Sequence, residues 1–281
     1  MTPEPMALLS ATERFWYRVA DAFARRFATV GVIWNFVFMV NIVRLVAVRR
    51  LVIDGLEHAT ALRPDDRVVL VCNHRSFFDY FVVGAMMYTR TTAPKRVMFP
   101  VRSPFFYDTV LGGMINGALA GFTMFPPIVR DGARSAWNKF ASDRMIEGLH
   151  AGPLLIGYHP EGKRGTGPDP YALLPGHAGV GRIVLDGPPG TKVVPVFVIG
   201  MTNSFGEELR RNWLRPSEFP IGVVFGPEIP IEDLRGREHA HGELTQRAMA
   251  GIGALAEWHR ANRGEAFRAA SRLSVSRPAG G

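Results

Sequence analysis

The stretch RVVLVCNHRSFFD, residues 67–79, decides how the rest of the chain is interpreted. Its uninterrupted apolar run, residues 68–71, is typical of a strand that is covered on both faces of a sheet. The residues that follow, from about Phe77 to Tyr88, predict a helix. A buried strand that leads directly into a helix indicates an α/β fold, in which polar residues at the junction lie at the carboxyl edge of the sheet.

Similar units recur along the 281 residues, a length that suits one large domain with an appendage. Further strands are predicted at 51–54, 97–101, 122–129, 154–158, 193–199 and 221–225, and helices at 133–150, 179–185 and 237–261. Strands that alternate with helices predict a mostly parallel, twisted sheet flanked by helices. Residues 50–262 are expected to form this domain, and the small, basic residues 263–281 a disordered tail.

Residues 1–49 are predicted to form a pair of N-terminal helices. Apolar side chains recur at every fourth position of the first helix, which makes it amphipathic: Phe15, Val19, Phe23 and Phe27. Residues 27–43 carry no charge, but at about 1.5 Å per residue they reach only roughly 25 Å, short of a bilayer core of about 30 Å. We expect both helices to lie in a membrane interface; a single spanning anchor and two core helices that cover the domain remain alternatives.

Composition narrows the classes of partner. The chain is 47% hydrophobic, which excludes a disordered protein, and its net charge of +8 favours a nucleic acid, an anionic membrane or a phosphorylated substrate. Cys72 is the one cysteine, so a disulfide within the chain and a cysteine-built metal site are excluded. No nucleic-acid reading motif accompanies the charge, and no metal or cofactor is implied. No secretory pattern opens the chain, so the cytoplasmic side is expected.

The junction at residues 73–79 carries the first candidate site. His74 comes just past the end of the predicted strand, and Asp79 falls in the first turn of the next helix. A histidine can accept a proton from an attacking hydroxyl when a carboxylate fixes its tautomer, so this pair predicts general-base chemistry. The spacing of Ser76 and Asp79 also fits a capping box, which needs no catalysis. Cys72 is interpreted as a small buried hydrophobe rather than as a nucleophile.

The second candidate site is the stretch YHPEGKRG, residues 158–165, which again follows an apolar strand. Two glycines allow a close backbone approach, Arg164 offers a bidentate fork, and Lys163 adds a mobile charge, so the turn suits a phosphate. A solvated basic loop is the alternative. Arg130, after the predicted strand 122–129, is a further candidate. The glycines at 112, 113, 117 and 121 lack the spacing of a nucleotide fingerprint and indicate close helix packing or a mobile loop.

Taken in order, these motifs resemble the glycerolipid acyltransferase family typified by 1-acylglycerol-3-phosphate acyltransferase. The family signature is Asn-His-x4-Asp, here Asn73, His74 and Asp79, followed far downstream by Glu-Gly-Thr-Arg, here the EGKR of residues 161–164. The similarity spans about residues 51–230. It implies that residues 50–262 are an acyltransferase domain of phospholipid biosynthesis, attached to the cytoplasmic face of a membrane through the N-terminal helices.

The resemblance also implies the reaction and its participants. The donor is acyl-CoA or acyl-carrier protein, and the acceptor is a lysophospholipid, with 1-acylglycerol-3-phosphate first among them. By the same resemblance, His74 acts as the general base of an O-acyltransferase and Asp79 orients it. The acceptor phosphate is held by the remaining matched residues: Arg130, Glu161, Gly162, Lys163 and Arg164.

Departures from the family pattern leave the acceptor open. Lys163 replaces the usual threonine, Val129 stands where an aspartate is common before Arg130, and the stretch 91–121 between the first two motifs is long. A specialised or remodelling lipid acyltransferase therefore remains an alternative, as does an anionic-lipid-binding protein without catalysis. A hydrolase is disfavoured because no Gly-x-Ser-x-Gly elbow is present.

Overall fold

The central element is a six-stranded sheet in the order β1-β8-β7-β2-β6-β3. The computed structural model describes residues 4–129 and 132–275. Every neighbouring pair in this sheet is parallel except β7 and β8, which are antiparallel. The prediction of a mostly parallel sheet flanked by helices is confirmed. The strands are β1 (Leu51–Asp54), β2 (Arg67–Cys72), β3 (Val97–Met98), β6 (Leu154–Tyr158), β7 (Thr191–Ile199) and β8 (Ile221–Phe225).

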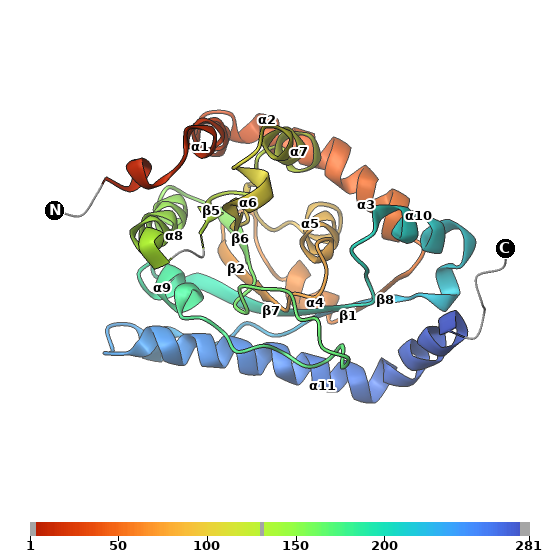
Figure 1. Cartoon of the computed structure of the whole chain (residues 1–281). Helices are drawn as coiled ribbons and strands as arrows, with labels where there is room; N and C mark the ends of the chain where they lie inside the picture. The colour runs from red at the N-terminus through yellow and green to blue at the C-terminus, as the bar shows by residue number, and fades with distance from the viewer. Residues whose placement is uncertain (1–3, 130–131, 276–281) are drawn as a thin grey trace.

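Helices cover both faces of the sheet (Figure 1). The α-helices are α1 (Ala11–Arg25), α2 (Ala28–Trp34), α3 (Val40–Ala47), α4 (Leu56–Thr60), α5 (Asp79–Arg90), α6 (Ser103–Phe106), α7 (Val110–Ala120), α8 (Ser135–His150), α9 (Gly179–Leu185), α10 (Phe205–Leu214) and α11 (Ala240–Val275). Short helical turns are η1 (Pro5–Leu8), the π-turn η2 (Asn35–Met39), η3 (Gly132–Arg134), η4 (Pro216–Glu218) and η5 (Glu232–Leu234).

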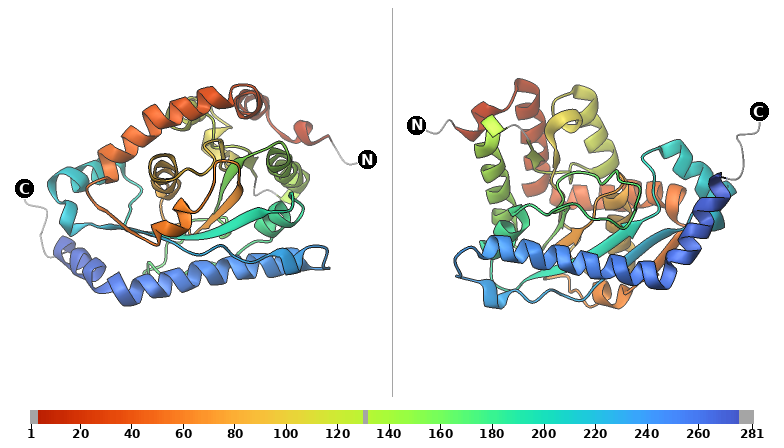
Figure 2. Two further views of the ribbon diagram at one scale, coloured as in Figure 1. Left: turned by 180° about the vertical axis from the view of Figure 1, so that it is seen from behind. Right: turned by 60° about the horizontal axis from the view of Figure 1, so that its bottom comes forward.

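Side chains alternate between two hydrophobic cores along each central strand. In β2, Val68 and Leu70 belong to the core shared with α3 and α5, whereas Val69 and Val71 belong to the core shared with α8, α9 and α11. This alternation follows from the two-residue period of a strand. Helix α11 runs along the opposite side of the sheet from α1, α2 and α3 (Figures 1 and 2).

The predicted strand 122–129 is wrong except at its end. Only β5 (Pro127–Ile128) pairs there, with β4 (Val101–Arg102), in a separate two-stranded sheet. Phe122 has a φ of 60°, outside the extended region. Pro126 and Pro127 carry no amide hydrogen, so neither can donate to a ladder.

The C-terminal helix is longer than predicted. It continues past residue 261 to Val275, so residues 263–275 are helical rather than a disordered tail, and 276–281 lie outside the described residues. Tertiary contacts explain the extension, because Arg263 pairs with Asp54 at 2.7 Å and the Phe267 ring lies edge-on to His259 at 4.6 Å. Such packing stabilises a helix beyond its local propensity.

The glycine-rich stretch packs closely, as one of the two interpretations of it predicted. A Cβ on Gly113 would lie 2.0 Å from the Trp16 ring, and one on Gly117 would lie 2.7 Å from the ring of Phe122. Both glycines belong to α7, and the indole of Trp34 donates to the Ala118 carbonyl at 2.9 Å. Helix α7 and the N-terminal helices therefore form one packed layer.

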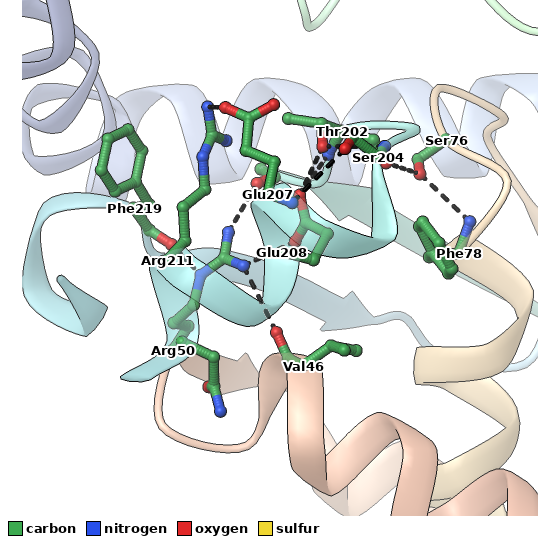
Figure 3. Close-up of polar contacts among 12 residues, drawn as sticks. Val46, Arg50, Ser76, Phe78, Thr202, Ser204, Glu207, Glu208, Arg211 and Phe219 are labelled. Atoms are coloured by element: carbon green, nitrogen blue, oxygen red, sulfur yellow. Dashed lines mark hydrogen bonds and ion pairs between the residues drawn. The ribbon is translucent and has the colours of Figure 1, made fainter. Parts of the chain in front are cut away.

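A buried ion pair joins distant parts of the chain at one edge of the domain (Figure 3). Arg50, just before β1, pairs with Glu208 of α10 at 2.5 Å, and neither side chain is exposed. The guanidinium also donates to the carbonyls of Phe219 and Gly200. The other oxygen of Glu208 accepts the amide and the hydroxyl of Thr202. The pair thus fixes the segment that follows β7.

Removing one partner of this pair should destabilise the domain strongly. Glu208→Leu leaves the Arg50 guanidinium buried without its carboxylate, and we expect the free energy of unfolding to fall by about 3 to 5 kcal/mol. The double variant Arg50→Met/Glu208→Leu should recover much of that loss, because no buried charge remains. Urea unfolding followed by circular dichroism measures both. Equal losses in the single and double variants would contradict this account.

Candidate active site

The loop after β2 is anchored by a buried asparagine. Asn73 is fully buried; its amide nitrogen donates to the Val198 carbonyl at 2.8 Å, and its amide oxygen accepts the Val198 amide at 2.7 Å. These two bonds extend the pairing of β2 with β7 by one residue. His74 therefore leaves the sheet at a fixed point on its carboxyl edge, where ligands of open α/β sheets bind.

His74 and Asp79 face each other across this loop. Nδ1 of His74 lies 3.5 Å from Oδ2 of Asp79, and the histidine side chain is 23% exposed while the carboxylate is 1% exposed. The imidazole is thus open to a ligand while its partner is enclosed. With Nδ1 directed at the carboxylate, a substrate proton would be taken by Nε2.

Asp79 also holds the loop itself. The oxygen that faces His74 accepts the amides of Arg75 at 2.8 Å and Ser76 at 2.7 Å. The Ser76 hydroxyl accepts from Phe78 and donates to the Thr202 carbonyl (Figure 3). Half of the predicted capping box is therefore present, because Asp79 accepts the Ser76 amide while the Ser76 hydroxyl accepts from Phe78 and not from Asp79. The same carboxylate also faces His74.

The environment of Asp79 shifts the pKa of its carboxyl. Burial raises its pKa to about 6, and the backbone amides of Ser76 and Arg75, which donate to the carboxylate, oppose that rise only in part. A carboxylate that titrates this close to neutrality can stabilise an imidazolium next to it at pH 7 and loses that ability in mild acid.

The EGKR turn lies against the same loop. Glu161 is 1% exposed; its Oε1 accepts the amide of His74 at 2.8 Å, and its Oε2 accepts the amide of Leu174 at 2.7 Å. The amide of Gly165 donates to the carbonyl of His74 at 2.8 Å. The two motifs, more than 80 residues apart in the sequence, therefore meet at one edge of the sheet.

A comparison with models of protein families finds a match to the part of the chain that contains both motifs. The family model described as Acyltransferase matches residues 50–199, which is just over half of the chain and contains both motifs. The chain belongs to the glycerolipid acyltransferase family. A search of curated proteins found no match.

In this acyltransferase, the position of Glu161 does not match the phosphate-binding role that the resemblance implied. The resemblance assigned it to the phosphate, but both carboxylate oxygens accept backbone amides inside the protein, and burial raises the pKa of its carboxyl. A buried carboxylate would also repel an anion. We therefore interpret Glu161 as the side chain that joins the two loops.

The exposed part of the turn consists of Gly162, Lys163 and Arg164. Gly162 has a φ of +61°, a conformation that glycine adopts without strain. Arg164 donates to the amide oxygen of Asn203 at 2.7 Å, and that oxygen also accepts the amide of Phe77. The guanidinium is thus held beside the loop that carries His74.

Arg130, a predicted phosphate ligand, lies outside the described residues. Arg134, which follows it, pairs with Glu13 of α1 at 3.1 Å. Cys72 is buried, and burial raises the pKa of its thiol, which disfavours the thiolate that a nucleophile requires. The interpretation of Cys72 as a buried hydrophobe agrees with this environment.

His159 is a site residue for which no role was predicted from the sequence. Its ring stacks on that of His74, with centroids 4.1 Å apart and planes inclined by 10°. Its Nδ1 lies 2.9 Å from the carbonyl of Cys72, which can only accept, so Nδ1 carries the proton. Burial lowers the pKa of His159 to about 3, so the ring is neutral and acts as a flat support for His74. Its position after β6, the strand beside β2, was the available signal.

The titration of Asp79 predicts an acid limb in the activity. As the pH falls through about 6, the carboxylate gains a proton and no longer stabilises an imidazolium at His74. We expect kcat/KM to fall about tenfold for each further pH unit. Initial rates measured across the acid range provide the test.

His159→Phe is the matched control for this limb. It keeps a flat ring under His74, and His159 itself is already neutral in this range, so the limb should persist near pH 6 in the variant. A limb that disappears with His159, or a wild-type profile that stays flat below pH 6, would contradict the assignment to Asp79.

Proposed function

We propose that this acyltransferase moves a fatty acyl group from acyl-CoA or acyl-carrier protein to a hydroxyl of a lysophospholipid, with 1-acylglycerol-3-phosphate as the first acceptor to test. The observation that carries the proposal is the meeting of the His74–Asp79 pair with the cationic turn at one sheet edge. Such an arrangement supports proton removal and phosphate binding within one substrate length.

The chemistry needs no covalent enzyme intermediate. Nε2 of His74 takes the proton of the acceptor hydroxyl as its oxygen attacks the thioester carbonyl. The tetrahedral intermediate then collapses, the C–S bond breaks, and the imidazolium returns the proton to the leaving thiolate. Asp79 stabilises the imidazolium between these steps without accepting the proton, and the stacked ring of His159 keeps the imidazole plane fixed.

Lys163 and Arg164 are proposed to hold the acceptor phosphate. Both are exposed, and Arg164 donates to the amide oxygen of Asn203, while no carboxylate of the described residues pairs with it. A guanidinium held by a neutral acceptor retains its charge for an anion. The phosphate then lies beside His74 rather than on it, which leaves the imidazole for the hydroxyl.

A binding protein without catalysis is the second candidate, because Asp79 has structural bonds that explain its burial. The position of His74 favours the enzyme. Its side chain is partly exposed while its carboxylate partner is enclosed, an arrangement that a purely structural pair does not need.

The proposed place of action is the surface of an anionic membrane on the cytoplasmic side. Helix Ala28–Ala47 is long and apolar enough to span a bilayer by length and composition alone, but Met39, Val43 and Val46 are buried against the domain. The opposite side of this helical layer exposes large apolar side chains: Phe15, Phe27, Val30, Ile33, Phe36, Val37, Phe38, Val110, Leu111 and Met114. A helix packed on one side and apolar on the other suits the interface.

Two substitutions separate the proposed roles at the active site. His74→Ala should lower kcat with acyl-CoA and 1-acylglycerol-3-phosphate by about 10²-fold or more, because the general base is lost. Arg164→Ala should mainly raise the KM for the acceptor, by about tenfold, because it contacts a group remote from the reacting bond.

The exposed side chains His150 and Arg90 provide controls, and alanine at either should leave the rates unchanged. Radiolabelled acyl-CoA with a panel of lysolipids gives the readout and ranks the acceptors. Equal activity in wild type and His74→Ala would dismiss the enzyme, and an unchanged acceptor KM in Arg164→Ala would dismiss the phosphate role.

The surface of the protein that is proposed to bind the membrane is tested by placing acidic residues on it. Ile33→Asp/Phe36→Asp should weaken binding to phosphatidylglycerol vesicles at least about tenfold, because two apolar side chains no longer enter the interface. Trp258→Asp is the matched control, since Trp258 is an exposed aromatic residue on α11, across the sheet from this layer (Figure 1). Vesicle flotation measures both variants, and similar losses in the two would refute this surface.

A further inference from the structure

A cavity of about 340 Å³ lies next to the active site. Its wall includes Arg75, the residue after His74, and Gly165, whose amide bonds to the carbonyl of His74. The residues at the end of β7, from Ile199 to Met201, form another part of the wall. The cavity is thus at the carboxyl edge of the sheet, on the α10 and α11 side of the His74 loop.

Three guanidinium groups from separate segments line this cavity: Arg75, Arg211 and Arg268. Arg75 donates to the Gly167 carbonyl at 2.8 Å, and Arg268 donates to the Gly264 carbonyl at 3.2 Å. In the described part of the chain no carboxylate forms an ion pair with either. Their charges are therefore held in place by neutral acceptors and not cancelled.

The side chain of Arg211 is partly enclosed. It pairs with Glu207 on the same helix, and its guanidinium lies 4.2 Å above the ring of Phe219 (Figure 3). Its Nε is buried, and no protein acceptor within the described ranges bonds to it. Glu218, the carboxylate of the lining, lies 3.5 Å from Arg215. The cavity therefore carries an excess of positive charge and an unused donor.

We propose that this cavity binds the phosphate-bearing nucleotide end of a coenzyme A thioester donor. The inference rests on the proposed acyl transfer and deepens it, because it selects acyl-CoA over an acyl-carrier protein. A carrier protein presents one phosphodiester and no nucleotide, whereas the nucleotide end of coenzyme A carries a diphosphate and a 3′-phosphate. Three cations from three segments match several phosphates better than one.

The two ends of coenzyme A fit two separate places in the protein, the cavity for the nucleotide and His74 for the thioester. The pantetheine arm joins the nucleotide to the thioester, so the nucleotide must bind beside His74 and not at it. Arg75 borders the cavity while His74 faces Asp79, so one loop reaches both. The volume lies in the range of small-molecule sites, and Tyr171, Phe219 and Phe267 give the walls apolar area for a base and ribose.

The acceptor phosphate is less suited to this cavity. A lysophospholipid phosphate is a single group close to the reacting hydroxyl, and the turn with Lys163 and Arg164 already stands beside His74. Two anionic substrates must be bound together in the reaction, and two separate cationic sites at one edge allow this without repulsion between them.

Binding of adenosine 3′,5′-bisphosphate to the whole protein tests the cavity without any turnover. Isothermal titration should show binding to wild type, at least about tenfold weaker binding to Arg268→Ala, and partial recovery in Arg268→Lys. Arg210→Ala is the matched control, because Arg210 is exposed on α10 next to Arg211 and does not line the cavity. Equal affinities in Arg268→Ala and Arg210→Ala would overturn the proposal.

Donor kinetics identify the ligand. Arg268→Ala should raise the KM for acyl-CoA about tenfold and leave that for the truncated donor acyl-pantetheine unchanged. Displacement of the bisphosphate by glycerol 3-phosphate would instead assign the cavity to the acceptor and overturn the proposal. If neither donor supports transfer in wild type, the proposed function fails, and the bisphosphate titration still decides whether the cavity binds nucleotide phosphates.

Discussion

The buried carboxylate of Glu161 is the constraint on which the active-site geometry depends. By accepting the amides of His74 and Leu174, it joins the loop after β2 to the segment after β6. Neither loop is otherwise regular, so their relative position comes from these bonds and from three further contacts: the Gly165 amide with the His74 carbonyl, His159 with the Cys72 carbonyl, and Arg75 with the Gly167 carbonyl. An acid is better suited than an amide side chain, because both of its oxygens accept. His74 and the cationic turn are thereby held as one unit.

The site gives several residues a structural and a chemical task at once. Asp79 closes the His74 loop through two amides and also faces the imidazole, which explains why it is kept buried although burial raises its pKa to about 6. The Arg50–Glu208 pair supports the site from behind the segment that follows β7. Glu208 holds Thr202, whose carbonyl accepts from Ser76, and the neighbouring Asn203 accepts from Arg164. Membership of the acyltransferase family and this arrangement agree with each other.

The sequence predicted the parts of the fold that have a local signal. Strands β1, β2, β6 and β8 lie where their apolar runs indicated, and the parallel topology then brought residues 74 and 161 to one edge. Contacts without a local signal were not predictable: the ring of His159 under His74, the inward position of Glu161, and the extension of α11 through Arg263. The cavity is the feature that the sequence could predict least, because its wall combines five separate segments.

The antiparallel direction of β8 affects how this enzyme can diverge. Since β8 runs antiparallel to β7, the whole connection from Gly200 to Pro220 begins and ends at the active edge, and it supplies Arg211 and Phe219 to the cavity. Changes in the length or charge of that connection would alter the space beside His74 while the ladder of β7 with β2 stays intact. Under the proposed binding of coenzyme A, changes in this one segment would alter donor preference while the His74–Asp79 pair stays unchanged.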